Sequence, residues 1–192
     1  MKARTVSARG VRFVVAGVTG GAGTTTVAAL LSVALDGRFG MPPSITDHTG
    51  GFLATRVNTT NPDTTRWVDD MGAHAEELDW QPGIYPVIVT SVDQEAGDNA
   101  LFILQSLAIS PSAASNEADG PAGARGVIIV NSTSPRRLPD PEVSRLAKTA
   151  PGATIIGLPW DAALSTPMAI NRNKTAPVTM NAIAQVLGAF SL

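Results

Sequence analysis

The residues with the clearest capacity for chemistry form the glycine-rich stretch GVTGGAGTTT, residues 17–26, referred to below as the phosphate loop. It follows the apolar run RFVVAGV (12–18), which predicts a buried strand, and leads into TTTVAALLSVALD (24–36), which predicts a helix that Gly37 can end. A strand, a glycine-rich turn and a helix in succession direct backbone N–H groups and the positive end of the helix dipole toward one spot. The stretch therefore predicts an anion site that suits phosphate.

The loop departs from the usual phosphate-binding pattern at its charged position. In G-x-x-x-x-G-K-[ST] the lysine reaches the phosphates and the hydroxyl residue holds Mg²⁺. Here Gly23 and Thr25 fit that pattern, whereas Val18 replaces the first glycine and Thr24 replaces the lysine. The chain has only three lysines but eleven arginines, so a basic replacement was available and was not used.

The doubled glycine followed by AGTTT resembles the deviant P-loop of the ParA/MinD family, K-G-G-x-G-K-[ST]-[ST]. In that family the early lysine reaches across a dimer to the partner's nucleotide, and Thr19 stands at its position here. Both lysines are therefore absent. The resemblance implies that the nucleotide-binding residues of the loop are Thr19, Gly20, Gly21, Ala22, Gly23, Thr24, Thr25 and Thr26.

Other segments resemble the same family in the same order along the chain. ITDHTGGFLA (45–54) resembles the second-strand motif, which implies that Asp47 faces Mg²⁺ and the attacking water and that Thr25 and Asp47 hold the metal. VIIVNSTSP (127–135) implies that Asn131 recognises the adenine edge. IIGLPWDAAL (155–164) implies that Pro159 and Asp161 lie near the base or ribose, and RWVDDM (66–71) resembles a segment of the CpaE-like, septum-site or pilus-assembly branch.

One family element has no clear counterpart, namely the strand that ends in the Walker B sequence Asp-Thr-x-Pro. Between residues 52 and 85 no apolar strand ends in Asp, and TTRWVDDMGAHAEEL (64–78) predicts a short helix with Asp69 and Asp70 solvated. PVIVTSVDQ (86–94) could supply the missing carboxylate through Asp93, although it resembles the next family strand more closely. The favoured interpretation is that the Walker B strand is lost or unrecognisable.

Strand and helix signals alternate along the rest of the chain. Strands are predicted at 43–47, 85–92, 126–131 and 153–161, and helices at 96–109, 140–150 (with Asp140 as N-cap) and 177–190. This alternation predicts a doubly wound α/β fold with a mostly parallel sheet flanked by helices, in one P-loop NTPase-like domain over 12–192. We expect a flexible basic tail at 1–11 and a flexible loop at 110–126, which is rich in Ala, Ser, Gly and Pro.

Composition narrows the possible classes of protein. The 192 residues carry a formal net charge of −2 and no cysteine, which excludes disulfides and thiolate metal sites and fits a cytoplasmic protein. The apolar residues of the last helix (Met180, Ile183, Leu187 and Phe190) have no basic neighbours, so we expect a core or docking helix rather than a membrane anchor. The two histidines, His48 and His74, are expected at the surface, and the three tryptophans (Trp67, Trp80 and Trp160) in packing.

These features favour a degenerate ParA/MinD-like protein, a non-hydrolysing scaffold for positioning, assembly or secretion machinery that binds ATP or ADP with Mg²⁺ weakly or not at all. Its expected partners are a protein of such an apparatus and a second copy in a homodimer, while DNA is less favoured and a membrane is not expected. The alternative is an active ATPase in plasmid or chromosome partition or cell-division positioning. Its rewired site would use an arginine, with Arg56, Arg136 and Arg137 as candidates.

Overall fold

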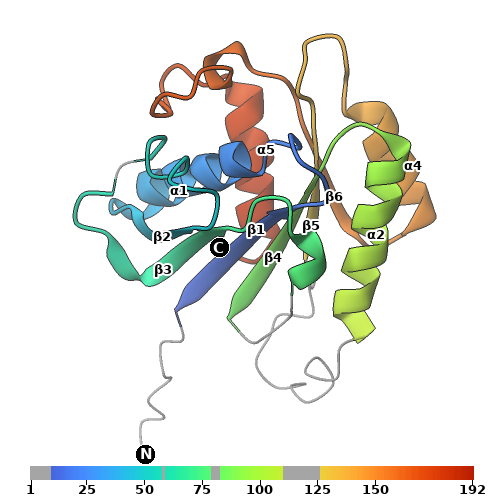
Figure 1. Cartoon of the computed structure of the whole chain (residues 1–192), viewed down its shortest axis with the longest axis horizontal. Coiled ribbons are helices and arrows are strands. Elements are labelled where there is room, and N and C mark those ends of the chain that lie inside the picture. Colours follow the sequence, from blue (N-terminus) through green and yellow to red (C-terminus); the bar gives the residue numbers. More distant parts are fainter. Residues whose placement is uncertain (1–9, 58, 79–82, 110–125) are drawn as a thin grey trace, which may run out of the picture.

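The protein is built around one parallel sheet. The structure is a computed structural model and describes residues 10–57, 59–78, 83–109 and 126–192. Within these residues six strands form a sheet in the order β2-β3-β1-β4-β5-β6 (Figure 1), and every pairing is parallel. The strands are β1 (Val11–Gly17), β2 (Pro43–Asp47), β3 (Asp63–Asp70), β4 (Ile84–Thr90), β5 (Val127–Asn131) and β6 (Thr154–Leu158). All carboxyl ends therefore lie along one edge, where open α/β sheets bind ligands.

Helices cover both faces of the sheet, which confirms the predicted doubly wound α/β fold. Helices α1 (Thr24–Phe39) and α5 (Pro177–Ala189) pack on one face, and α2 (Gln94–Ile109) and α4 (Asp140–Thr149) pack on the other. Two short 3₁₀ helices, η1 (Ala75–Glu77) and η2 (Ala162–Leu164), follow β3 and β6. Each face thus has its own apolar layer.

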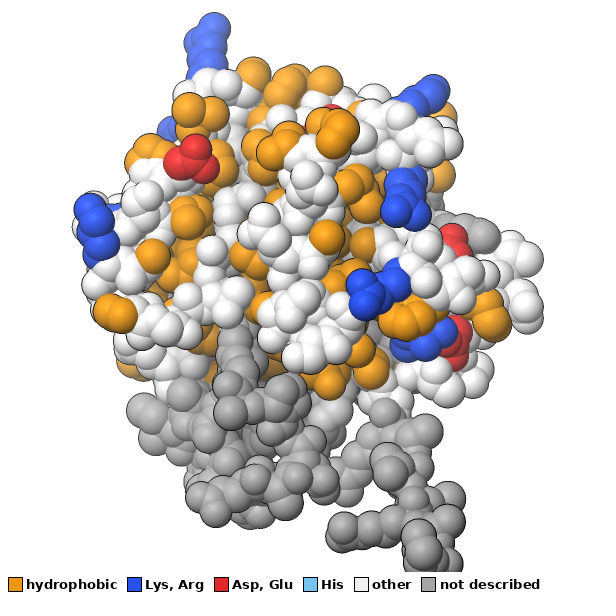
Figure 2. All heavy atoms as spheres, turned by 180° about the vertical axis from the view of Figure 1, so that it is seen from behind, with side chains coloured by type: hydrophobic (Ala, Val, Ile, Leu, Met, Phe, Trp, Pro, Cys, Tyr) orange, Lys and Arg blue, Asp and Glu red, His pale blue; other side chains and the backbone are white. Residues whose placement is uncertain are grey.

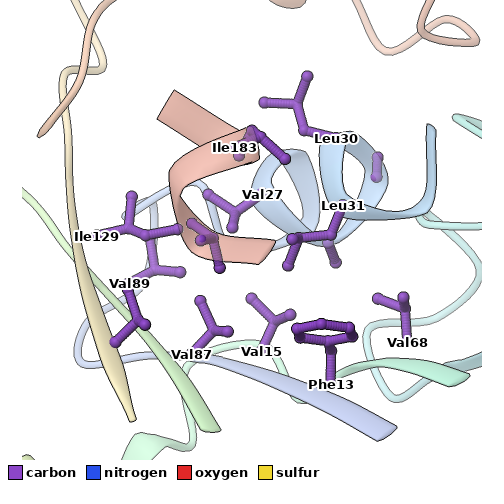
Figure 3. Packing of buried hydrophobic residues seen from close by; sticks show 14 of the residues in the cluster. Phe13, Val15, Val27, Leu30, Leu31, Val68, Val87, Val89, Ile129 and Ile183 are labelled. Carbon is purple, nitrogen blue, oxygen red and sulfur yellow. The ribbon is translucent and has the colours of Figure 1, made fainter. Parts of the chain in front are cut away.

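The larger apolar layer fixes α1 and α5 on the sheet (Figure 3). Side chains of α1 and Ile183 of α5 face a row of buried side chains from β1, β3, β4 and β5. At the other end of this layer, the Phe190 ring lies 4.8 Å from that of Tyr85 and 5.7 Å from that of Phe13, between ring centroids. Because Ile183, Leu187 and Phe190 are buried in this layer, the prediction that the last helix belongs to the core is confirmed.

The main error of the sequence prediction lies at β3. Residues 63–70 form a strand between β2 and β1, not the start of the expected helix. Asp69 and Asp70, expected in solvent, are 2% and 0% exposed. The strand was missed because it lacks an apolar run. It is paired on both sides, yet most of the side chains in its first half are exposed or half-buried.

Two helix ends also differ from prediction. Helix α1 continues through Gly37 to Phe39. Its C-cap is Gly40, whose backbone adopts φ 73° and whose N–H donates to the Asp36 carbonyl. Gly37 lies inside the helix, and the Arg172 guanidinium occupies the space that a Cβ there would fill. Helix α4 begins at Asp140 with Pro139 as its N-cap, so the prediction that Asp140 caps it was wrong.

The surface seen from behind in Figure 2 carries few charged side chains, and hydrophobic side chains occur there in separate groups among uncharged side chains and backbone. Among the described helices, none is long and apolar enough to cross a bilayer. The predicted flexible tail and flexible loop fall almost entirely on residues 1–9 and 110–125, outside the part that the structure describes, and so does Trp80.

Candidate functional site

The phosphate loop joins β1 to α1, as the sequence predicts. Gly21 and Gly23 have φ of 77° and 89°, a left-handed conformation that glycine adopts without steric cost. Gly23 is the N-cap of α1 and its carbonyl accepts the first helical hydrogen bond, from the Val27 N–H at 3.0 Å. The Val18 N–H donates to the Val89 carbonyl at 3.0 Å. The loop is thereby anchored between β1 and β4, at the carboxyl edge of the sheet.

The two positions at which the family has lysines carry no charge here. Thr24 is only 6% exposed, and its hydroxyl packs so closely on Gly17 that a Cβ at Gly17 would collide with it. Thr19 is exposed and offers a short uncharged side chain. Any phosphate at this loop would therefore meet backbone N–H groups and hydroxyls at these positions instead of ammonium groups.

Asn131 closes β5 and reaches the phosphate loop. Its side-chain Nδ2 donates to the Ala22 carbonyl at 2.8 Å, and the residue is 7% exposed. Nδ2 also occupies the space that a Cβ on Gly23 would need. The Asn131 side chain thus supports the phosphate loop through the Ala22 carbonyl. Recognition of adenine by Asn131 stays a prediction.

Asp70 lies at the end of β3 and is fully buried. Its Oδ1 accepts from the Gly72 N–H at 3.0 Å, whereas Oδ2 accepts no hydrogen bond of normal geometry. Burial raises the pKa of Asp70, and the negative charge of Asp47 adds to that rise, while the nearby Thr25 hydroxyl, the Gly72 N–H and His48 oppose it. Among the described residues, one buried oxygen of Asp70 therefore lies near the Thr25 hydroxyl without a hydrogen bond of normal geometry.

Asp47 closes β2 next to Asp70, which is its register partner on β3. Oδ1 of Asp47 accepts from the N–H and the hydroxyl of Thr49 at 2.8 and 2.7 Å, and Oδ2 accepts from the Leu53 N–H at 2.6 Å. Partial burial acts to raise the pKa of Asp47, but hydrogen bonds from Thr49, Leu53 and Gly51 outweigh burial and lower it. At this site the Asp47 carboxylate is held in its ionised form, whereas the Asp70 carboxyl group resists ionisation.

The strand expected to be lost or unrecognisable has a counterpart by position in β3. It follows the second-strand motif and precedes β4, which is where the resemblance places the Walker B strand. It ends at Asp70, and Met71 and Gly72 follow it. Asp93, the alternative carboxylate, follows β4 and is largely exposed, and it accepts from Arg137 Nη1 at 2.8 Å. Sequence reasoning missed Asp70 because it required an apolar strand; the available signal was Trp67-Val68 directly before two aspartates and a glycine.

Of the three candidate arginines, the structure brings Arg56 to the phosphate loop. Nη1 of Arg56 donates to Thr26 Oγ1 at 2.8 Å, and Nη2 donates to the carbonyls of Leu164 and Thr166 at 2.9 and 3.3 Å. Arg137 pairs with Asp93, and Arg136 is exposed in the turn after β5. Only Arg56 is therefore in contact with a residue of the loop among these three.

Asp161, which follows β6, has a structural role. Oδ1 of Asp161 accepts from the Ala163 N–H at 3.0 Å, and Oδ2 accepts from the Ala176 N–H at 2.7 Å and the Thr179 hydroxyl at 3.0 Å. This buried carboxylate joins η2 to the start of α5. Pro159 is half-buried, and its role beside a nucleotide base stays a prediction. Trp160 is 39% exposed, so it does not have the buried packing role expected of it.

The two histidines lie at the surface, as expected. His48 is exposed directly after Asp47, and His74 lies near two exposed carboxylates, Glu76 and Glu77, at 3.8 and 3.4 Å from its Nδ1. These three exposed groups could together face one cation, but exposed acidic groups of this kind are common without one.

Known structures resemble this chain over nearly its whole length. A ParA family ATPase from Chlorobium tepidum TLS matches with a TM-score of 0.55 and 15% identity, over 94% of this chain and 99% of that one. A substituted form of Cyanothece McdA in complex with ATP matches with a TM-score of 0.58 and 14% identity, over 96% and 97%. The Aquifex aeolicus MinC:MinD cell division protein complex matches with a TM-score of 0.58 and 12% identity, over 93% and 96%.

No model of a protein family matches the sequence, and no curated protein matches it. The likeness is therefore one of structure at low sequence identity, which establishes the fold. Strand order, the placement of the phosphate loop and the agreement with three solved structures lead to the same conclusion: the chain has a ParA/MinD-like fold.

Proposed function

We propose that this chain is a ParA/MinD-like positioning or assembly protein that binds Mg²⁺–nucleotide weakly and does not hydrolyse it efficiently. The observation that carries the proposal is Thr24, 6% exposed and packed on Gly17 where the P-loop lysine belongs. Thr19, at the position of the second lysine, is equally uncharged. The fold keeps the backbone of the site without its two ammonium groups.

The described residues fit a magnesium ion. Mg²⁺ prefers oxygen ligands and is commonly held by one or two carboxylates together with phosphate oxygens. The unpartnered Oδ2 of buried Asp70 and the adjacent Thr25 hydroxyl supply such oxygens, and Asp47 is the neighbouring carboxylate. When bound, the ion would neutralise phosphate charge. Because two carboxylates lie at this site, we expect nucleotide binding to depend on Mg²⁺.

The absence of the two lysines determines how much weaker nucleotide binding and hydrolysis are expected to be. A charge-assisted hydrogen bond contributes about 1.5–3 kcal/mol, so the loss of one lysine–phosphate contact weakens binding by roughly 10–150-fold. Phosphoryl transfer depends on positioning and charge stabilisation, and the removal of one preorganised donor can cost about 10²–10³ in rate. Weak binding without efficient hydrolysis follows from these magnitudes.

A protein that binds nucleotide without turnover acts through its contacts with other proteins. MinD was solved as a complex with MinC, and we propose a comparable role here, as a scaffold for a protein of an assembly or secretion apparatus. A homodimer across the nucleotide edge is part of the same proposal, as is a cytoplasmic location. The exposed side chains of Phe52 and Met168, at 63% and 71% exposure, offer apolar contact area for such partners.

The second candidate is an active ATPase with a rewired site that serves partition or cell-division positioning. Retention of Asp70 beside Thr25, and of Asp47 as its register partner, favours it. If this candidate is correct, Thr25→Ala and Asp70→Asn abolish turnover. If the scaffold is correct, there is no turnover for these substitutions to abolish.

Isothermal titration with ATP and with ADP, each with and without Mg²⁺, together with an assay of phosphate release, tests the proposal. We expect Mg²⁺-dependent dissociation constants weaker than roughly 100 μM and no phosphate release above the protein-free control. Submicromolar affinity combined with measurable phosphate release would contradict the scaffold and support the ATPase.

A further inference from the structure

Arg56 is a buried cation without an anionic partner. It is 9% exposed, and among the described residues no carboxylate oxygen lies within 4.0 Å of its guanidinium nitrogens. Its Nε is buried and makes no hydrogen bond. Buried charges in proteins are normally paired. An uncompensated guanidinium therefore indicates a place for an anion.

Arg56 lies at the N-terminal end of α1, where the helix itself adds positive potential. Its Nη1 donates to the hydroxyl of Thr26, in the first turn of α1, and the N-terminus of a helix already carries positive potential. A cation at that end of a helix is unfavourable unless negative charge is bound there. The first turn of α1 has no acidic residue, and Asp47 and Asp70, which lie near Thr25, are not paired with Arg56 among the described residues. An anion bound at the loop would supply this missing charge.

The hydrogen bond also prepares Thr26 to act as a donor. Because Thr26 Oγ1 accepts from Arg56, the hydroxyl hydrogen of Thr26 is free to donate elsewhere. A hydroxyl that accepts a charge-assisted hydrogen bond is polarised and donates more strongly. Arg56 can thus stabilise an anion at the loop through Thr26 without touching the anion itself.

Arg56 is held in place from several sides. Its Nη2 donates to the Leu164 and Thr166 carbonyls, its N–H donates to the Leu53 carbonyl at 2.9 Å, and its carbonyl accepts from the Ile170 N–H at 2.9 Å. The charge is therefore positioned before any ligand arrives, which reduces the entropy lost on binding.

We propose that Arg56 is the resident cation of the phosphate loop and that, through Thr26, it binds the phosphate groups of a nucleotide. This inference rests on the proposed function, because it places the nucleotide at the same loop. Arg56 is anchored beside Thr26 and is not at either lysine position, so it supports phosphate binding without restoring hydrolysis. It is a positioning residue, not a catalytic one.

Phosphate binding by matched variants tests this role. ATP, pyrophosphate and orthophosphate, each with Mg²⁺, are titrated into the wild-type protein and into Arg56→Gln, Arg56→Lys, Thr26→Val and Arg56→Gln/Thr26→Val. Binding is followed by ³¹P NMR. Arg137→Gln is the control, because Arg137 is an exposed arginine paired with Asp93 instead of the loop.

We expect Arg56→Gln and Thr26→Val each to weaken ATP binding by about 10-fold or more. The double variant should be no weaker than the weaker single variant, because both changes break the same relay, and Arg56→Lys should recover part of the affinity. Arg137→Gln should bind as the wild type does. If the protein recognises the phosphates alone, Arg56→Gln should weaken pyrophosphate binding by the same factor as ATP binding. If the nucleoside also contributes, the factor for pyrophosphate should be smaller.

The inference is overturned if the wild type binds none of these ligands up to roughly 10 mM, a result that also removes weak nucleotide binding from the proposed function but leaves the scaffold role. It is also overturned if folded Arg56→Gln and Thr26→Val bind as the wild type does, or if their effects simply add. Thr26→Val keeps the size of the side chain, so it tests the relay even if Arg56→Gln does not fold. Efficient hydrolysis by the wild type would instead contradict the scaffold function.

Discussion

The Asn131 side chain at the end of β5 donates to the Ala22 carbonyl in the phosphate loop at 2.8 Å, across 109 positions of sequence. The bond joins the loop to a strand on the far side of β4. Together with the Val18–Val89 backbone hydrogen bond, it fixes the loop against β4 and β5. The loop conformation is thus a property of the fold.

Replacement of Asn131 by Ala should therefore destabilise the protein. The substitution leaves the Ala22 carbonyl without its partner in a buried position, which costs about 1–3 kcal/mol. Urea denaturation measures the change in the free energy of unfolding. Asn173→Ala, at an exposed turn residue, is the control and should lie within about 0.5 kcal/mol of the wild type. Equal midpoints for the Asn131 variant and the wild type would show that this bond does not support the loop.

Asp70 should make stability fall as pH rises. Its folded-state pKa is raised above the ordinary 3.8 by burial, so its contribution to stability is fully present below 3.8 and is lost as pH rises through the folded pKa. Asp70→Asn removes this dependence and should become more stable relative to the wild type from pH 4 toward pH 8. Urea midpoints of both proteins across this range measure the difference. A constant difference would contradict the raised pKa.

Asp47 should behave in the opposite way. Its folded-state pKa lies below the ordinary 3.8, since the hydrogen bonds to its carboxylate outweigh the effect of burial. Its contribution is therefore present above 3.8 and is lost as pH falls through the lowered value. Asp47→Asn should be less stable than the wild type at pH 7, with the gap closing below pH 3.8. Measurement of both aspartate variants on one pH axis should give slopes of opposite sign.

Restoration of the lysines should strengthen nucleotide binding. Thr19→Lys adds a cation at an exposed position, and Thr24→Lys adds one at the position of the P-loop lysine. Each regained contact is expected to improve Mg²⁺–ATP affinity by roughly 10–150-fold. Titration calorimetry of the two single variants and the double variant measures this. Because Thr24 packs on Gly17, a thermal melt must show that the Thr24 variants remain folded. If folded variants bind ATP no better than the wild type does, the missing lysines are not the cause of weak binding.

The sequence predicted the parts of this protein that depend on local pattern. The strand–loop–helix unit around residues 17–26 and the buried strands β4 and β5 carry strong apolar signals, and their positions are confirmed. The polar strand β3 does not carry such a signal, because its burial comes from pairing with β1 and β2 and not from its own composition. The contact of Arg56 with Thr26 joins two segments 30 positions apart, so only the fold could select Arg56 over Arg136 and Arg137.

The rate of phosphate release from Mg²⁺–ATP by the unaltered protein tests most directly whether the loss of both lysines has ended catalysis. The assay uses millimolar ATP to offset weak binding and includes Asp70→Asn and Thr25→Ala as background controls. We expect the wild type to release phosphate no faster than either variant. Phosphate release by the wild type that clearly exceeds both would contradict a non-hydrolysing scaffold and would identify the site as a working ATPase.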